Sequence, residues 1–333
     1  MSSPAAPSYL RLGAWHPASI RFSHMTLPTR DIAQSKRFFL EVLGGELVTE
    51  TPLVRVHFRN FGVVLGPQDG GTTEPDREYP HYAFTVPADQ FAPLKQRLEA
   101  YGIPTHDPWT RAGETHSLMY FRDPSGNQYE LFCPEGDPGF ELRIGANAGG
   151  DYVVPFSSLG YESLGGSAAR GQAAPPVMPL EFNHLTLPSR SVGESKRFFT
   201  EIFGTEVTVD IPVHVSVVLG GFEFGYGGLE DGGWPKPDQQ YPRFTLSIDP
   251  GELPPLKERL AAFGVPTSDI WTSDDVDASL YFRDPSGNLY EARAERGFDG
   301  PVRRRPGAGE DHVPDLESLW YDSWNDLERG GRP

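Results

Sequence analysis

The sequence predicts an α+β protein built from four βαβββ units, which are arranged as two tandem copies. The first observation is a duplication: residues 22–30 return as 182–190 and residues 120–127 return as 281–288, so the copies lie 160 or 161 residues apart. The second is the pattern inside each copy, which reads strand, helix and several strands, twice over. A chain of 333 residues also suits two domains, on the usual prior of roughly 150 residues each. This is one duplication rather than an array of short repeats.

The first unit of each copy begins with a half-buried strand. Residues 20–27 alternate apolar and polar side chains, and Asp31 then offers an N-cap for a helix. Apolar residues fall at helical spacing over residues 32–43, and two glycines after this stretch end the helix. Short β-rich runs follow, separated by Gly, Pro and Asn, at residues 46–50, 54–58 and 62–65.

The second unit repeats this order. Residues 82–86 read as a strand, and residues 91–101 as an amphipathic helix closed by Gly102. A hairpin follows, whose strands at residues 119–121 and 128–132 are joined by the turn sequence Asp-Pro-Ser-Gly.

The segment between the copies is rich in Gly, Ala, Ser and Pro, but only residues 165–179 read as a linker. Residues 151–164 have a counterpart at residues 311–323 at the same offset, so the duplicated unit includes a C-terminal extension. Apolar residues in it, such as Trp320 and Trp324, predict that it packs on the mouth of a domain or on a partner subunit. The predicted domains are therefore residues 1–164 and 180–333.

Composition and charge exclude several classes of partner. The chain has 29 Lys and Arg against 46 Asp and Glu, a net charge of −17 that repels nucleic-acid backbones and anionic membranes. The first residues show no basic segment followed by an apolar run, and no apolar stretch approaches the length of about 18 residues that spans a membrane. The single cysteine, Cys133, suits a reducing compartment. We expect a cytoplasmic protein that binds neither nucleic acid nor membrane, and a homo-oligomer is compatible with the sequence.

Three matched positions carry metal-ligand chemistry in the first copy. His24, His81 and Glu130 correspond to His184, Arg243 and Glu291 in the second copy. Two neutral imidazoles and a carboxylate make an open 2-His-1-carboxylate site, which suits Fe(II), Mn(II) or a related ion. An arginine keeps its charge and offers no lone pair. The sequence therefore predicts an intact metal site in the first domain and a degenerate one in the second.

These motifs resemble one known superfamily. The strand-opening His, the helix sequence Ser-Lys-Arg-Phe-Phe at residues 35–39 and 195–199, and Tyr-Phe-Arg-Asp-Pro-Ser-Gly-Asn followed by Tyr-Glu are similar to the vicinal oxygen chelate superfamily. That group includes glyoxalase I, fosfomycin-resistance proteins, bleomycin-binding proteins and extradiol ring-cleaving dioxygenases. The resemblance covers roughly residues 20–135 and 180–295. It implies that the paired units form two cup-shaped mixed β-sheets able to hold a divalent metal, but a fold alone does not choose a reaction.

The resemblance also bears on the number of ligands. Glyoxalase I-like members recruit a fourth ligand, a Glu, from the last strand of the first unit, where residues 61–66 of this chain offer none. The first copy therefore resembles the three-ligand members. In the second copy Glu223 falls near that place, so His184, Glu223 and Glu291 stay open as a second metal site. The preferred interpretation is that Arg243 occupies the former metal position and pairs with Glu291, Glu223 or both.

Three further residues are candidates for catalysis. Tyr120 precedes Glu130 by ten residues on the neighbouring hairpin strand, where similar extradiol dioxygenases carry a tyrosine that contacts the substrate oxygen. Plain packing is the alternative, because Tyr281 repeats the residue in the second copy. His116 and His57 are candidate proton-transfer groups because the second copy lacks both, and ordinary surface or core roles stay open for them.

The preferred functional hypothesis is a non-haem Fe(II) extradiol-type dioxygenase that opens a catechol-like aromatic ring with O2. Tyr120 then orients the substrate, and His116 or His57 transfers protons. Such enzymes usually keep the metal in the C-terminal domain, from which this chain departs. One alternative is a glyoxalase- or fosfomycin-type lyase, isomerase or thiol transferase that uses Mn(II), Ni(II) or Zn(II) as a Lewis acid. Another is a binding protein that sequesters a small aromatic molecule or an antibiotic.

Overall fold

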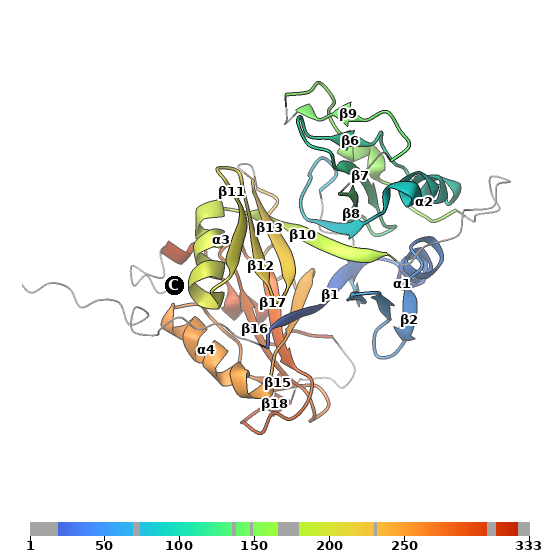
Figure 1. Ribbon diagram of the computed structural model, residues 1–333. Coiled ribbons are helices and arrows are strands. Elements are labelled where there is room, and N and C mark those ends of the chain that lie inside the picture. Colours follow the sequence, from blue (N-terminus) through green and yellow to red (C-terminus); the bar gives the residue numbers. More distant parts are fainter. Residues whose placement is uncertain are drawn as a thin grey trace, which may run out of the picture. The chain divides into compact units, whose positions relative to one another are not determined.

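The chain folds into two compact units. The computed structural model describes residues 19–68, 74–134, 138–146, 149–165, 180–229, 232–304 and 311–325. One unit runs from Thr26 to Thr186 and is called the middle unit; the other, the terminal unit, comprises Met1–Met25 and Leu187–Pro333. Figure 1 shows the helices and strands of the middle unit mainly in blue and green, and those of the terminal unit mainly in yellow to red.

The middle unit holds two βαβββ units. Its first strands are β1 (Arg21–Thr29), β2 (Glu46–Thr49), β3 (Arg55–Phe58) and β4 (Phe61–Pro67), ordered β1-β4-β3-β2. A second group runs β10-β5-β8-β7-β6-β9 and consists of β5 (His81–Thr85), β6 (Trp109–Thr110), β7 (Ser117–Arg122), β8 (Gln128–Cys133), β9 (Arg143–Ile144) and β10 (Glu181–Ser189). The helices are α1 (Ile32–Arg37), which continues as a π-helical turn over Phe38–Val42, and α2 (Ala88–Ala100). β5 and β8 are parallel and β7 and β8 antiparallel, so the sheet is mixed.

The terminal unit repeats this plan. Its strands are β11 (Glu206–Ile211), β12 (His214–Leu219), β13 (Phe222–Gly228), β14 (Arg243–Ser247), β15 (Trp271–Thr272), β16 (Ala278–Arg283), β17 (Leu289–Ala294) and β18 (Arg303–Arg304). They are ordered β11-β12-β13-β10 and β18-β15-β16-β17-β14-β1. The helices are α3 (Val192–Phe198), with a π-helical turn over Phe199–Phe203, and α4 (Leu253–Ala262). The predicted α+β fold of four βαβββ units is confirmed.

Strands β1 and β10 are each divided between the two units. The boundary falls after Met25 in β1 and after Thr186 in β10. The compact units therefore begin and end at other residues than the predicted domains, which stay a prediction. The predicted linker, apart from its first residue, lies outside the described residues.

The repeated Asp-Pro-Ser-Gly-Asn sequence forms a hydrogen-bonded turn in both copies. Asp123 Oδ1 accepts hydrogen bonds from the backbone N–H groups of Ser125 (2.8 Å) and Asn127 (2.9 Å), which closes the β7–β8 turn. Asn127 Nδ2 donates to the carbonyl of Pro28 at 2.9 Å, so the turn is tied to β1. The same bonds recur around Asp284 in the terminal unit. This turn sets the register of the hairpin that carries Tyr120 and Glu130.

Most predicted elements are confirmed within a few residues. Asp31 caps α1, since its side chain accepts a hydrogen bond from the N–H of Gln34. The two-residue strands β6 and β9 were not predicted, because two residues are too few to show a β period. No helix among the described residues combines the length and the apolar character needed to cross a membrane.

The predicted C-terminal extension packs on its own unit in both copies. In the middle unit Leu159 is buried in a cluster with Trp109 and Tyr120. In the terminal unit Leu319 is buried against Trp271 and Tyr281 in the same way. The extension is therefore a wall of each unit, laid over the strands that follow the second helix.

Candidate metal centre

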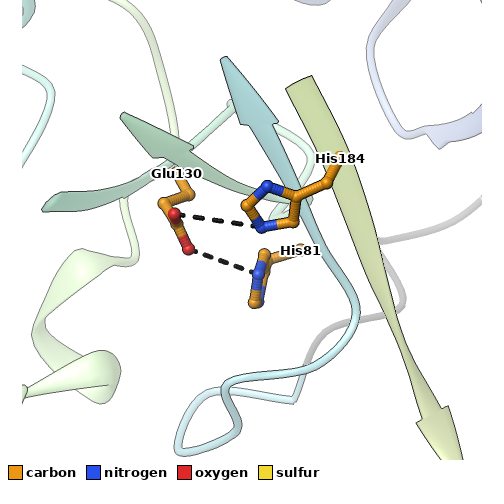
Figure 2. Close-up of side chains that lie close together, drawn as sticks. All are labelled: His81, Glu130 and His184. Carbon is orange, nitrogen blue, oxygen red and sulfur yellow. Dashed lines mark ion pairs between the residues drawn. The ribbon is translucent and has the colours of Figure 1, made fainter. Parts of the chain in front are cut away.

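Strand register brings three side chains of the middle unit to one place. Strand β5 lies between β10, where His184 pairs with Ala83, and β8, where Ala83 pairs with Glu130. His81 lies two residues before Ala83 and so faces the same side of the sheet. The ligand atoms of His81, Glu130 and His184 all lie within 4.8 Å of one another, and Figure 2 shows both imidazoles directed at the carboxylate.

A β-bulge at Asn183 aims His184 at this site. The register of β10 on β5 shifts between Phe182 and His184, so Phe182 pairs with Phe84 while His184 pairs with Ala83. Neighbouring residues of β5 point to opposite faces, and the bulge therefore turns these two residues of β10 to opposite faces as well. Phe182 stacks on Phe61 at 4.2 Å between ring centroids, which leaves the other face to the histidine.

Both histidines are held with Nε2 toward the carboxylate. His81 Nδ1 donates to the carbonyl of Glu78 at 3.1 Å, and His184 Nδ1 donates to Asn183 Oδ1 at 2.7 Å. The Asn183 amide is itself fixed, because its Nδ2 donates to Thr85 Oγ1 at 2.8 Å. A histidine that donates through Nδ1 keeps the lone pair on Nε2, which is the arrangement of a metal-binding histidine with an outer-shell partner.

Glu130 is a buried carboxylate between these rings. Its side chain is 3% exposed; His81 Nε2 lies 3.3 Å from Oε2 and His184 Nε2 lies 4.0 Å from Oε1. Burial raises the pKa of Glu130 to about 8, and the nearby Tyr120 hydroxyl and the charge of Arg111 counteract part of that rise. A carboxylate kept from water in this way favours a bound cation.

The group of side chains differs from the predicted ligand set in one residue. His81 and Glu130 are brought together as expected, but the partner is His184, whereas His24 belongs to the terminal unit. His24 and His184 occupy the same position in two strands of nearly identical sequence, so the sequence does not show which of the two strands pairs with β5. His184 therefore does not lie with Glu223 and Glu291, the three residues that the sequence left open as a second metal site. Glu223 lies half-buried on β13.

The matched site of the terminal unit is closed by an ion-pair network. Arg243 Nε donates to Glu291 Oε2 at 3.0 Å, which confirms the expected pair, and Arg243 Nη2 donates to Asp311 Oδ1 at 2.6 Å. Burial acts to lower the pKa of Arg243, but the carboxylates of Asp311 and Glu291 outweigh it and raise that pKa. Asp311 comes from the C-terminal extension, and the sequence did not identify it as a partner. A guanidinium thus stands beside Glu291 where the other unit has the His81 imidazole.

Glu291 accepts three further hydrogen bonds, and the middle unit lacks two of their donors. Thr245 Oγ1 donates at 3.2 Å, Ser279 Oγ at 2.6 Å and Tyr281 at 3.2 Å. By register, Thr245 corresponds to Ala83, Ser279 to Leu118 and Tyr281 to Tyr120, so only the tyrosine is kept beside Glu130.

Tyr120 lies directly opposite Glu130 on the neighbouring strand. The pair is in register between β7 and β8, and the Tyr120 hydroxyl donates to Glu78 Oε1 at 3.0 Å. Burial raises the pKa of Tyr120 well above its usual value. The hydroxyl is thus a neutral hydrogen-bonding group beside the site, held by a carboxylate that the sequence did not single out.

The two candidate proton-transfer histidines lie in different surroundings. The His116 ring packs on Phe132 at 5.5 Å between centroids, and Phe132 in turn contacts the His184 ring at 5.7 Å. His116 Nδ1 pairs with Glu114 at 2.6 Å, yet burial lowers the pKa of His116 overall. His57 is exposed on β3 and is not part of the His81, Glu130 and His184 group.

The donor set fits a divalent metal. Two Nε2 lone pairs and one carboxylate converge, and Ala83, the residue between His184 and Glu130, carries only a methyl group. Glu130 Oε1 is buried and accepts no hydrogen bond among the described residues. Three such ligands on one side would leave coordination positions for substrate.

Known proteins resemble part of this chain. The profile of the Glyoxalase/Bleomycin resistance protein/Dioxygenase superfamily matches residues 21–131. The glutathione transferase FosA of Serratia marcescens is 33% identical over 112 residues, which cover 33% of this chain and 77% of that protein. Biphenyl-2,3-diol 1,2-dioxygenase 3 of Rhodococcus globerulus is 31% identical over 123 residues, 33% of this chain and 62% of that protein. Each of these matches covers about a third of this chain.

Solved structures share the fold over most of the chain. A Bacillus subtilis protein provisionally described as a dioxygenase superposes with a TM-score of 0.57 at 16% identity, over 95% of this chain and 97% of that one. A single-residue mutant of glyoxalase I from Zea mays gives a TM-score of 0.58 at 15% identity, over 86% and 97% of the two chains. With sequence similarity that spans most of the Serratia relative and a fold shared almost end to end, the chain belongs to the glyoxalase/bleomycin resistance protein/dioxygenase superfamily.

Proposed function

We propose that the protein is a metal-dependent enzyme whose one open metal centre consists of His81, Glu130 and His184. The observation that carries this proposal is the contrast between Glu130 and Glu291. Glu291 is neutralised by Arg243 and accepts hydrogen bonds from two hydroxyl donors that the middle unit lacks. A buried carboxylate without such donors is costly, and a metal ion held by Glu130 and two imidazoles removes that cost.

The preferred metal is Fe(II), because two histidines and one carboxylate on a face with open positions are typical of non-haem Fe(II) oxygenases. Mn(II), Ni(II) and Zn(II) are the alternatives. When bound, the ion would supply positive charge and sites for substrate oxygens and O2. Asn183 and the carbonyl of Glu78 would keep the two imidazoles in the tautomer that binds it.

The proposed reaction is extradiol-type cleavage of a catechol-like aromatic ring, in which both atoms of O2 enter the opened product. Tyr120 is proposed to orient a substrate hydroxyl, because its own hydroxyl lies beside Glu130 and is held by Glu78. His116 is kept as the candidate proton-transfer group because the second copy lacks it; the Phe132 ring lies between its imidazole and that of His184. His57 stays a prediction, as does the cytoplasmic location. The similarity to a biphenyl-diol dioxygenase supports this reaction class.

A thiol transferase is the second candidate function. The glutathione transferase FosA and the metallothiol transferase FosB of Staphylococcus saprophyticus, 27% identical over 112 residues, support it. That chemistry uses the metal as a Lewis acid and consumes no O2. The two candidates therefore differ in a quantity that can be measured directly.

The test is metal analysis of protein purified without oxygen, followed by O2 uptake with a panel of catechols. We expect one equivalent of iron per chain and uptake that His81→Ala abolishes. His312→Ala, at an exposed histidine outside the site, is the matched control and should keep both metal and uptake. Zinc, nickel or manganese with no O2 uptake would support the transferase, and no bound metal would overturn the proposal.

A further inference from the structure

A cavity of about 470 Å³ lies in the middle unit, and one of its lining residues, Glu78, is hydrogen-bonded to His81 of the candidate metal centre. We propose that it binds the part of the substrate remote from the metal, and that it accepts neutral or cationic aromatic groups and rejects anions. This deepens the proposed function and rests on it. The size falls within the range of roughly 300–1,000 Å³ that small-molecule sites occupy.

Glu78 connects the cavity to the metal centre. Its side chain lines the cavity and accepts the hydroxyl hydrogen of Tyr120 at 3.0 Å. Its backbone carbonyl accepts from His81 Nδ1 at 3.1 Å and from Gln128 Nε2 at 2.8 Å. A molecule with one end at the metal ligands would therefore meet this residue before it reaches the rest of the cavity.

The C-terminal extension supplies one wall of the cavity. Tyr152 and Phe156 line it together with Trp109, and Phe156 also packs on the Tyr120 ring at 5.3 Å between centroids. Gly145 permits this packing, because a Cβ there would lie 2.5 Å from the Trp109 ring. The indole N–H of Trp109 is buried and has no hydrogen-bond acceptor among the described residues. These rings form the kind of surface on which an aromatic group packs.

The charge around the cavity is negative. Asp76 and Glu78 line it, and none of the described lining residues is Lys, Arg or His. Nearby Arg77 pairs with Glu74 at 3.5 Å, and nearby Arg143 pairs with Asp107 at 3.4 Å. The positive charge of Arg111 also acts on Glu78. An anionic group would meet the carboxylates of Asp76 and Glu78, whereas an ammonium group would be attracted to them and to the aromatic faces.

The terminal unit shows how the same wall can close the space. There Asp311 reaches Arg243, and the N–H of Val313 points to Gln240 Oε1 at 3.4 Å. Gln240 stands at the position of Glu78, and Asp311 at the position of Asp151, which is exposed in the middle unit. The extension therefore contacts the core of the degenerate site, while in the middle unit it borders a cavity.

The test uses three ligands with one skeleton: 2-phenylethylammonium, 2-phenylethanol and 2-phenylethanesulfonate. They lack a diol, so their binding does not depend on ring cleavage, and calorimetric titration of the metal-loaded protein measures their affinities. We expect the ammonium and the alcohol to bind at least tenfold more tightly than the sulfonate. Ala146→Leu, at an exposed residue on the rim of the cavity, should weaken all three.

Variants that remove a negative charge test whether the lining carboxylates cause the preference for ammonium over sulfonate. Asp76→Asn and Glu78→Gln should each reduce the preference for the ammonium over the sulfonate several-fold, whereas Glu162→Gln, an exposed acid outside the cavity, should leave it unchanged. Equal affinity for ammonium and sulfonate, no binding of any of the three, or no effect of Asp76→Asn would overturn the inference. Charge selectivity without O2 uptake on any catechol would sustain the cavity and reject the dioxygenase.

Discussion

Glu130 and Glu291 occupy the same position in the two copies, yet the negative charges of their buried carboxylates are compensated differently. Glu291 is neutralised within the protein, by a guanidinium and by hydroxyl donors. Glu130 faces two imidazole nitrogens instead. On the proposed function, a few substitutions around one carboxylate separate a closed ionic cluster from a site for a cation, because a buried charge needs compensation from one source or the other.

The largest expected effect comes from changing His81. His81→Ala should lose the metal, with an affinity loss that exceeds the roughly 10–100-fold typical of removing an outer-shell partner. His81→Arg should lose the metal as well, but it places a guanidinium beside Glu130 as in the terminal unit. Metal content and urea unfolding of both variants measure the two effects. If the Arg variant were no more stable than the Ala variant, a guanidinium beside Glu130 would not compensate its charge as Arg243 compensates that of Glu291.

The second effect is on the stability of the terminal unit. Arg243→Ala leaves Glu291 and Asp311 buried without their cation, which should lower the free energy of unfolding by about 3–5 kcal/mol. Arg304→Ala removes an exposed ion pair with Asp275 and should cost only about 0–1 kcal/mol. Denaturant unfolding compares the two. Equal costs would mean that the buried network does not replace a metal in stabilising the site.

A smaller effect is expected from the residue that holds His184. Asn183→Ala removes the acceptor of the His184 Nδ1 hydrogen and should weaken metal binding by about 10–100-fold. Asn60→Ala is the control, because Asn60 Nδ2 donates to the backbone carbonyl of Phe182, on the same strand as His184, at 2.8 Å. A chelator competition assay measures both affinities. The same loss in both variants would indicate strand positioning rather than control of the imidazole.

The smallest expected effect is a difference between the two units in how their stability depends on pH. Burial lowers the pKa of His106 to about 4. The neutral His106 ring accepts a hydrogen bond from the backbone N–H of Tyr120 at 2.9 Å. In the terminal unit the side chain of Ser268 accepts the corresponding hydrogen bond from the N–H of Tyr281. Because the unfolded chain takes up a proton near pH 6.5 and the folded ring only near pH 4, stability should fall as pH drops through this window.

The loss should be about 1 kcal/mol by pH 5.5. His106→Ser, which copies the terminal unit, should reduce the slope of stability against pH when urea unfolding is followed between pH 7.5 and 5.5. An unchanged slope would show that other groups cause the acid sensitivity.

Much of the fold followed from sequence because its determinants are local. The helix cap at Asp31 and the turn at Asp123 depend on hydrogen bonds between residues two to four apart. Strands β6 and β9 escaped prediction because their two-residue lengths carry no periodic signal. Asn183 could have been noticed as an amide beside a candidate ligand, but nothing in the sequence shows that its oxygen reaches the ring.

The sequence by itself determined the duplication, the four βαβββ units, and two of the three residues at the candidate centre, His81 and Glu130. The tertiary structure decided the third. Residues 22–28 and 182–188 have almost the same sequence, and both present a histidine at the same strand position. Only the pairing of β10 with β5, between residues about a hundred positions apart, selects His184 over His24. Long-range strand pairing is decided by packing of the whole unit, which neither strand encodes alone.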